Sequence, residues 1–212
     1  KIDSEHVIVN ERDSSPCDEL ARAVMDQVVG EDYAHTQRDT DGPDERAADA
    51  VGQAGGHVAA LMGRDPREII FTSGATEANN LAIKGSVRFR ARYGDGRRRI
   101  ITVATEHKCV LESVRDLAQE GFEPVILEVD HNGRVDPATL RDALAVPTAL
   151  VSIMAVNNET GVMQDLPVLG RIVKETGALL HSDLAQAAGK MAIDVRALDL
   201  DLASLSAHKM YG

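Results

Sequence analysis

The chain is poor in aromatic residues and contains no tryptophan. Phe, Tyr and Trp make up 3% of its 212 residues, whereas hydrophobic residues as a class reach 43%. Aliphatic side chains therefore have to build most of the core. A chain of this length can bury a large core without cross-links. The composition indicates an ordinary globular protein and excludes a small scaffold held together by disulfides.

Cysteine is equally scarce, with Cys17 and Cys109 as the two examples. Two cysteines form neither a disulfide framework nor a metal-ligand spacing. We therefore expect no metal and a reducing compartment, the cytoplasm, with an organellar address left open. No apolar run approaches the roughly 20 residues of a membrane span, so no membrane partner is expected. The chain begins with Lys1 rather than Met, which leaves open a targeting segment that was removed.

An excess of basic charge is also missing. The formal net charge is −11, and a nucleic-acid partner would require a basic face that neutralises phosphates. The one basic run, Arg97–Arg99, follows a glycine-containing turn and is typical of a solvated loop. The charge balance therefore argues against a nucleic-acid partner.

From residue 69 onward, short aliphatic strands alternate with amphipathic helices. This alternation predicts an α/β fold with a mainly parallel sheet flanked by helices. The predicted strands are Ile69–Thr72, Ile100–Val103, Pro124–Val129, Leu150–Met154, Ala178–Leu180 and Leu202–Leu205. The predicted helices are Asp44–Met62, Thr76–Arg90, Lys108–Gln119, Pro137–Leu144, which Asp136 would cap, and Leu166–Thr176.

The first part of the chain carries a weaker pattern. It contains a short strand at Val7–Val9 and a helix at Asp18–Val29, followed by a polar, loop-like stretch. Residues 1–43 are therefore predicted to form an N-terminal arm and loop. Residues 44–212 are predicted to form the larger domain.

Two of the predicted strands lead to a carboxylate and an amine. Asp183 follows the fifth strand and Lys209 follows the sixth, and ligands of open α/β sheets bind at the carboxyl ends of strands. A pyridoxal phosphate site needs a Schiff-base lysine and a carboxylate that keeps the ring nitrogen protonated. Taken singly, Asp183 also fits a helix N-cap and Lys209 a solvated cation.

Other strand ends add polar groups to the same edge. The turn Thr72–Asn80 opens a helix and is suited to bind phosphate through backbone N–H groups and the Thr76 hydroxyl, although the same pattern is typical of an ordinary helix cap. His107 follows the second strand, either as a cap or as an imidazole beside a flat cofactor. Asn157–Asn158 forms either a plain turn or a pair of neutral donors. Cys109 is interpreted as buried filler rather than a nucleophile.

Five motifs in order closely resemble the cysteine desulfurases of the NifS/IscS type. These are fold-type I pyridoxal phosphate enzymes related to the class V aminotransferases, and the resemblance runs from about residue 60 to the end of the chain. The motifs that carry it are Ile69–Asn80, Thr105–Lys108, Val156–Gly161, His181–Gln186 and Ser206–Gly212.

The resemblance implies a role for each matching residue. Lys209 would hold the cofactor and move the substrate proton, Asp183 would pair with the ring nitrogen, and His107 would stack on the ring and assist proton transfer. Gln186 and Asn158 would interact with the ring oxygen of the cofactor, and Asn158 would also lie near the substrate. The phosphate would be bound by the backbone of Ala75 and by Thr76, Ser206 and His208.

The sequence also departs from the family pattern. Asn10–Pro16 carries charges where the family has small residues, Gly30–Thr36 matches a family loop poorly, and Leu184 stands where Ala is usual. These changes concern the substrate-facing arm more than the cofactor site. Leu184 either crowds the ring or packs beneath it.

The end of the chain is the largest departure. The family continues past its lysine into more sheet, a small C-terminal domain and the loop with the cysteine that receives sulfur. Neither Cys17 nor Cys109 occupies that position, so neither is assigned as the persulfide carrier. We expect the chain to be a fragment or one part of a split protein.

The activity that the resemblance implies is conversion of L-cysteine to L-alanine, with sulfur passed on as a persulfide for iron–sulfur cluster or thio-cofactor synthesis. The implied partners are L-cysteine, a sulfur acceptor or iron–sulfur scaffold protein, and a second copy in a homodimer. Residues 44–212 would be an incomplete pyridoxal phosphate-binding large domain. The alternatives are another class V activity, such as a selenocysteine lyase or an aminotransferase, and a non-catalytic scaffold that retains the fold.

Overall fold

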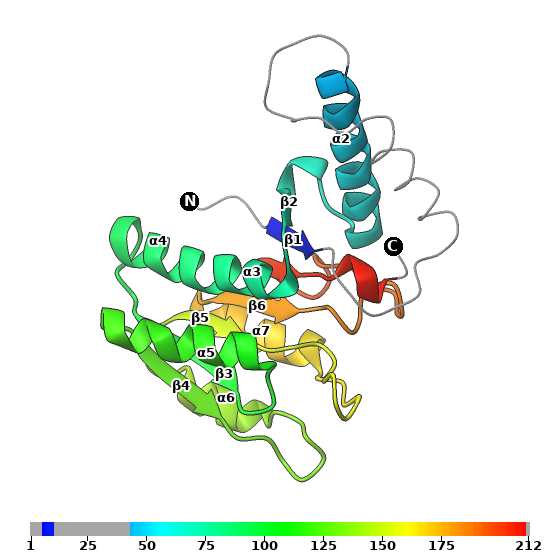
Figure 1. Ribbon diagram of the computed structural model, residues 1–212. Coiled ribbons are helices and arrows are strands. Elements are labelled where there is room, and N and C mark those ends of the chain that lie inside the picture. The colour runs from blue at the N-terminus through cyan, green and yellow to red at the C-terminus, as the bar shows by residue number, and fades with distance from the viewer. Residues whose placement is uncertain (1–5, 11–42, 211–212) are drawn as a thin grey trace.

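The computed structural model describes residues 6–10 and 43–210. They form one seven-stranded sheet in the order β2–β1–β7–β6–β5–β3–β4 (Figure 1). Each neighbouring pair of strands is parallel, which confirms the predicted fold class. The strands are β1 (His6–Asn10), β2 (Ile69–Thr72), β3 (Arg99–Val103), β4 (Glu123–Leu127), β5 (Thr148–Ser152), β6 (Leu179–Asp183) and β7 (Leu202–Ser204).

The helices fall between the strands as the periodicity predicts. They are α2 (Pro43–Met62), η1 (Pro66–Glu68), α3 (Ala75–Asn80), η2 (Leu81–Gly85), α4 (Ser86–Tyr93), α5 (Lys108–Asp116), η3 (Leu117–Glu120), α6 (Pro137–Ala143), α7 (Leu166–Thr176) and η4 (Ala207–Lys209). The predicted helix Asp18–Val29 and Cys17 lie outside the described residues. In the part of the chain that the structure describes, no helix is both long and apolar enough to span a membrane.

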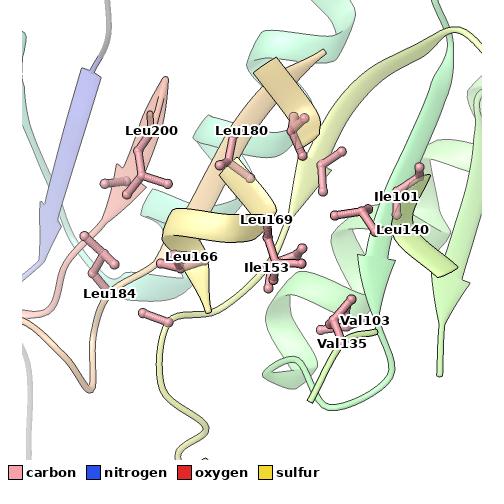
Figure 2. Packing of buried hydrophobic residues seen from close by; sticks show 14 of the residues in the cluster. Ile101, Val103, Val135, Leu140, Ile153, Leu166, Leu169, Leu180, Leu184 and Leu200 are labelled. Carbon is pink, nitrogen blue, oxygen red and sulfur yellow. The ribbon is translucent and has the colours of Figure 1, made fainter. Parts of the chain in front are cut away.

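The sheet is covered on both faces, because successive strand residues point to opposite sides. Ile100 packs into a cluster with Val87 of α4 and Val114 of α5. The next residue, Ile101, belongs to the cluster on the other face, which α6 and α7 cover. Figure 2 shows that second cluster, with Leu166, Leu169, Ile153, Leu180 and Leu184 gathered together. Both clusters are built mainly from aliphatic side chains, and Phe122 joins the first of them.

The start of α6 shows how local sequence positions an element. The Asp136 side chain accepts hydrogen bonds from the backbone N–H groups of Ala138 and Thr139, and Pro137 takes the first helical position. Both features satisfy or remove N–H groups that have no partner inside the helix. The predicted cap at Asp136 is confirmed.

The strand order decides which strand ends meet. β1 lies between β2 and β7, so residues 6–10 supply an inner strand of the sheet. β6 lies beside β7, and Asp183 is paired with Ser204. Because all strands run the same way, the segments that follow β2, β3, β5, β6 and β7 reach one edge of the sheet.

Candidate active site

Asp183 ends β6 at the carboxyl edge of the sheet, with 6% of its surface exposed. Its Oδ1 accepts a hydrogen bond from the backbone N–H of Ala185 at 2.9 Å, and its Oδ2 accepts one from Nδ2 of Asn79 at 2.8 Å. Bonds of this kind offset the cost of burying a carboxylate. The two donors fix the direction of the Asp183 carboxylate.

Lys209 reaches the same edge from the neighbouring strand. β7 ends at Ser204, opposite Asp183, and the chain then turns through Ser206 into η4, which ends at Lys209. The backbone N–H of Lys209 donates to the Ser206 carbonyl at 3.0 Å. Among the described residues, no hydrogen bond or ion pair holds Nζ of Lys209. The strands that lead to Asp183 and Lys209 are therefore neighbours in the sheet.

His107 is the N-cap of α5. Its Nδ1 accepts a hydrogen bond from the backbone N–H of Cys109 at 3.2 Å and lies 3.0 Å from Sγ of Cys109. The capping alternative for His107 therefore holds, while the ring stays exposed at the edge. Burial raises the pKa of the Cys109 thiol, with an opposing contribution from the hydrogen bond of Asn79. The thiol form is therefore favoured for this side chain, which is half-buried rather than buried.

The turn after β2 leads into a continuous helical stretch from Ala75 to Tyr93, formed by α3, η2 and α4. Gly74 is the N-cap and contributes no side-chain bond. Glu77 instead accepts hydrogen bonds from the backbone N–H and hydroxyl of Ser73, both at 2.6 Å. The Thr76 side chain is exposed at this helix start, where N–H groups favour an anion.

The remaining predicted site residues differ in how they are held. Ser206 is buried, and its hydroxyl lies 3.0 Å from Nδ1 of His208. Oε1 of the half-buried Gln186 accepts a hydrogen bond from Lys190 at 3.1 Å. Asn158 is exposed and makes no hydrogen bond to another described side chain or backbone group. The roles assigned to these residues stay predictions.

Asn157 stabilises the loop after β5 through its side-chain hydrogen bonds. Its Nδ2 donates to the Thr105 carbonyl at 2.8 Å, and its Oδ1 accepts from the backbone N–H groups of Glu159 and Thr160. Asn157 thus holds the turn and ties it to the loop that carries His107. Asn158, the next residue, has its side chain exposed.

Glu106 is a buried carboxyl that sequence reasoning did not single out. Its Oε1 accepts a hydrogen bond from the backbone N–H of Met154 at 2.6 Å, and its Oε2 has no partner among the described residues. Burial, reinforced by the charge of Asp183, raises the pKa of Glu106 well above its ordinary value. The protonated form is favoured, so this carboxyl adds little negative charge beside Asp183.

His181 is a second buried titratable group behind the site. Its Nδ1 lies 2.8 Å from the Ser152 hydroxyl on β5, and its Nε2 lies 2.9 Å from the Ser204 hydroxyl on β7. The ring is fully buried. Burial lowers the pKa of His181 from 6.5 to about 4, against the opposing effect of Asp183. The imidazole is therefore neutral near pH 7 and connects three central strands.

This arrangement predicts a loss of stability in acid. Above pH 6.5 the imidazole is neutral both folded and unfolded, so its stabilising effect is complete. As the pH falls from 6.5 toward 4, the unfolded chain binds a proton that folded His181 does not. We expect the free energy of unfolding to fall by about 3 kcal/mol across this window, as urea unfolding of the apo-protein at several pH values would measure.

The control for this prediction is the exposed His131, which lies in a loop. His131→Gln should retain the pH dependence of the wild type. His181→Gln, whose amide can still donate and accept between the two serines, should flatten it. An equal slope in His181→Gln and wild type would contradict the assignment.

The contact between Asn79 and Asp183 is the main feature that sequence reasoning missed. The two residues are 104 positions apart, and no local pattern links them. Asn79 was visible as part of the Ile69–Asn80 motif, without a role. A metal site was not expected, and among the described residues no group of three or more His, Cys, Asp or Glu side chains could hold a metal ion.

The chain resembles known proteins both in sequence and in structure. The chain is 53% identical over 166 residues to the cysteine desulfurase IscS of Rickettsia felis, an alignment that covers 78% of this chain and 40% of that protein. The structure matches that of SspA in complex with cysteine, with a TM-score of 0.87, 34% identity, and coverage of 94% of this chain and 56% of that one. A NifS-like protein matches with a TM-score of 0.86 and 35% identity, covering 94% and 54% of the two chains.

The chain thus spans about two fifths of the length of the curated relative. A model of the aminotransferase class-V family matches residues 14–212. The match runs through the five motifs and the strand ends that carry Asp183 and Lys209, which confirms the resemblance read from the sequence. The chain therefore belongs to the class-V aminotransferase family.

Proposed function

We propose that this chain provides the cofactor-binding part of a pyridoxal phosphate-dependent cysteine desulfurase. The reaction is L-cysteine plus an acceptor thiol giving L-alanine plus an acceptor persulfide. The observation that carries the proposal is the pairing of β6 with β7. It brings the buried Asp183 carboxylate, held by two hydrogen bonds, to the same edge of the sheet as Lys209, whose Nζ has no partner among the described residues. Relatives that are 51–53% identical and are named cysteine desulfurase support the choice of substrate.

The residues present fit pyridoxal phosphate. Asp183 offers a fixed carboxylate for a protonated ring nitrogen, and Lys209 offers an amine without a competing partner among the described residues. Ala75 and Thr76 stand at a helix start that favours the phosphate. Ser206 and His208 offer further donors to it. His107, Asn158 and Gln186 are placed after strands that end at the same edge.

When bound, pyridoxal phosphate supplies an electron sink for the carbon atom that loses or gains a proton. In the proposal, Asp183 keeps the ring nitrogen protonated. Lys209 takes and returns the substrate proton at Nζ, while His107 assists proton transfer at its exposed ring edge. Asn158 orients the substrate through its amide. Neutral His181 and the protonated form of Glu106 limit the number of charges behind Asp183.

The proposal also covers the domain, the oligomeric state, the sulfur acceptor and the location of the protein. Residues 44–212 act as the large cofactor-binding domain, and the functional unit is a homodimer. Sulfur passes to an acceptor such as an iron–sulfur scaffold protein. The proposed location is the cytoplasm, which the free thiol of Cys109 supports because reducing compartments keep thiols unpaired.

Product analysis of the full-length protein tests the proposed activity. With pyridoxal phosphate and a dithiol reductant, L-cysteine should yield equal amounts of L-alanine and sulfide. A selenocysteine lyase would release selenide but little sulfide, and an aminotransferase would form a keto acid. A non-catalytic scaffold would give none of these products, and any of these three results would overturn the proposal.

A further inference from the structure

Asp183 and His107 are connected through two intervening side chains, those of Asn79 and Cys109. Nδ2 of Asn79 donates to Oδ2 of Asp183 at 2.8 Å and to Sγ of Cys109 at 3.4 Å. Sγ of Cys109 in turn lies 3.0 Å from Nδ1 of His107. This series of contacts joins the loops and helices after β2, β3 and β6, so it crosses the site from the carboxylate to the imidazole.

The donor and the acceptor of each hydrogen bond to His107 can be assigned. The backbone N–H of Cys109 can only donate, and it donates to Nδ1 of His107, so Nδ1 carries a lone pair. A neutral imidazole with a lone pair at Nδ1 holds its proton at Nε2. Burial raises the pKa of the Cys109 thiol, which keeps the S–H available as a second donor to Nδ1.

Asn79 is oriented by the same logic. Its side chain is fully buried, and a carboxylate accepts but does not donate, so the amide must turn its NH₂ group toward Asp183. The two hydrogens of that group serve the carboxylate and the Cys109 sulfur. Its Oδ1 has no partner among the described residues, which shows that the donor side determines the orientation.

We propose that Asn79 and Cys109 are positioning residues that fix the Asp183 carboxylate and hold His107 as the tautomer with a proton on Nε2. This inference rests on the proposed function, because Asp183 and His107 are the residues that the proposed function assigns to the cofactor. Asn79 acts on Asp183, and Cys109 acts on His107. In this arrangement His107 presents an N–H donor, not a lone pair, at Nε2.

The tautomer can be measured without the cofactor. We expect ¹⁵N spectra of histidine-labelled, full-length apo-protein to show His107 with a protonated Nε2 and an unprotonated Nδ1, with the signals assigned by loss in His107→Asn. A proton on Nδ1 of neutral His107 would overturn the inference. That result would leave cofactor binding, and hence the proposed function, untouched.

The Asn79 half is tested by two variants that remove its donor. Asn79→Ala leaves a gap, whereas Asn79→Leu fills the space. Loss of a hydrogen bond to a charged group should weaken pyridoxal phosphate binding about tenfold or more in both, and should move the pH dependence of the cofactor absorption spectrum. Asn132→Ala is the matched control, because Asn132 is exposed in the loop after β4 and its Nδ2 donates to the Asp130 carboxylate. Wild-type affinity and spectrum in folded Asn79→Leu would overturn this half.

The Cys109 half is tested by rescue. Cys109→Ala removes one neutral hydrogen bond to His107 and should lower kcat about fivefold with little change in KM. Cys109→Ser retains a donor and should restore most of the loss. Ser113→Ala, which removes a bond to the Cys109 carbonyl in the same helix, should leave kcat unchanged. Equal kcat values in Cys109→Ala and wild type would overturn this half.

Discussion

Replacing Lys209 with alanine is expected to abolish covalent attachment of pyridoxal phosphate and to lower turnover by at least about 10²–10⁴-fold, the usual contribution of a general acid–base group. Lys209 stands on η4 beyond β7, and among the described residues nothing pairs with its Nζ. Its loss therefore leaves no buried partner unsatisfied. The fold should survive while the chemistry is lost.

Reduction with borohydride followed by mass spectrometry measures the attachment. The wild-type protein should retain the mass of the reduced cofactor, and Lys209→Ala should not. Lys174→Ala is the matched control, because Lys174 lies on α7 and is 3.9 Å from Asp201 in a weak, half-exposed ion pair. A reduced adduct of equal yield in Lys209→Ala would show that another lysine carries the cofactor.

Asp183→Asn should produce the second largest effect. The change keeps the shape of the side chain but removes its charge, so the proton on the ring nitrogen loses its partner. An opposite charge within about 4–6 Å shifts a pKa by about 1–3 units, so we expect activity to fall about 10- to 1000-fold. The visible spectrum of the bound cofactor should change with pH at lower values than in the wild type.

The stability of Asp183→Asn separates this effect from damage to the fold. The protonated form of Glu106 carries little charge, so removal of the Asp183 charge leaves this pair nearly unchanged. The Asn79 amide can turn its Oδ1, which has no partner among the described residues, toward the new NH₂ group, so we expect the apo-variant to be about as stable as the wild type in urea. Full activity of the variant would contradict the assigned role, whereas reduced stability would place the loss in packing.

Sequence patterns located most of the elements, because periodicity and caps act over short distances. The helix at Leu166–Thr176 has the predicted bounds, and α6 begins at Pro137 after the predicted Asp136 cap. Strand bounds differ by up to a few residues. The predicted strand Ala178–Leu180 extends to Asp183 as β6, because the polar residues His181 and Ser182 find buried partners that a hydrophobicity pattern does not reveal.

The candidate site was also largely visible in the sequence, since its residues directly follow aliphatic strands. Lys209 and His107 stand out as residues of reactive types at predicted strand ends. Asn157 and Asn158 could not be ranked in this way, as adjacent amides look alike in sequence. The structure distinguishes them: Asn157 holds the turn, and Asn158 is exposed.

The sequence by itself determined the class of fold, the aliphatic core and the residues offered at each strand end, because these depend on side-chain type and local spacing. The tertiary structure alone decided that β6 and β7 are neighbours, which brings Asp183 and the Lys209 segment together. It also decided that Asn79 bonds to Asp183 across 104 positions. Strand order and burial are set by packing of the whole chain, so hydrogen-bond partners and pKa values in the interior follow from the fold rather than from any single segment.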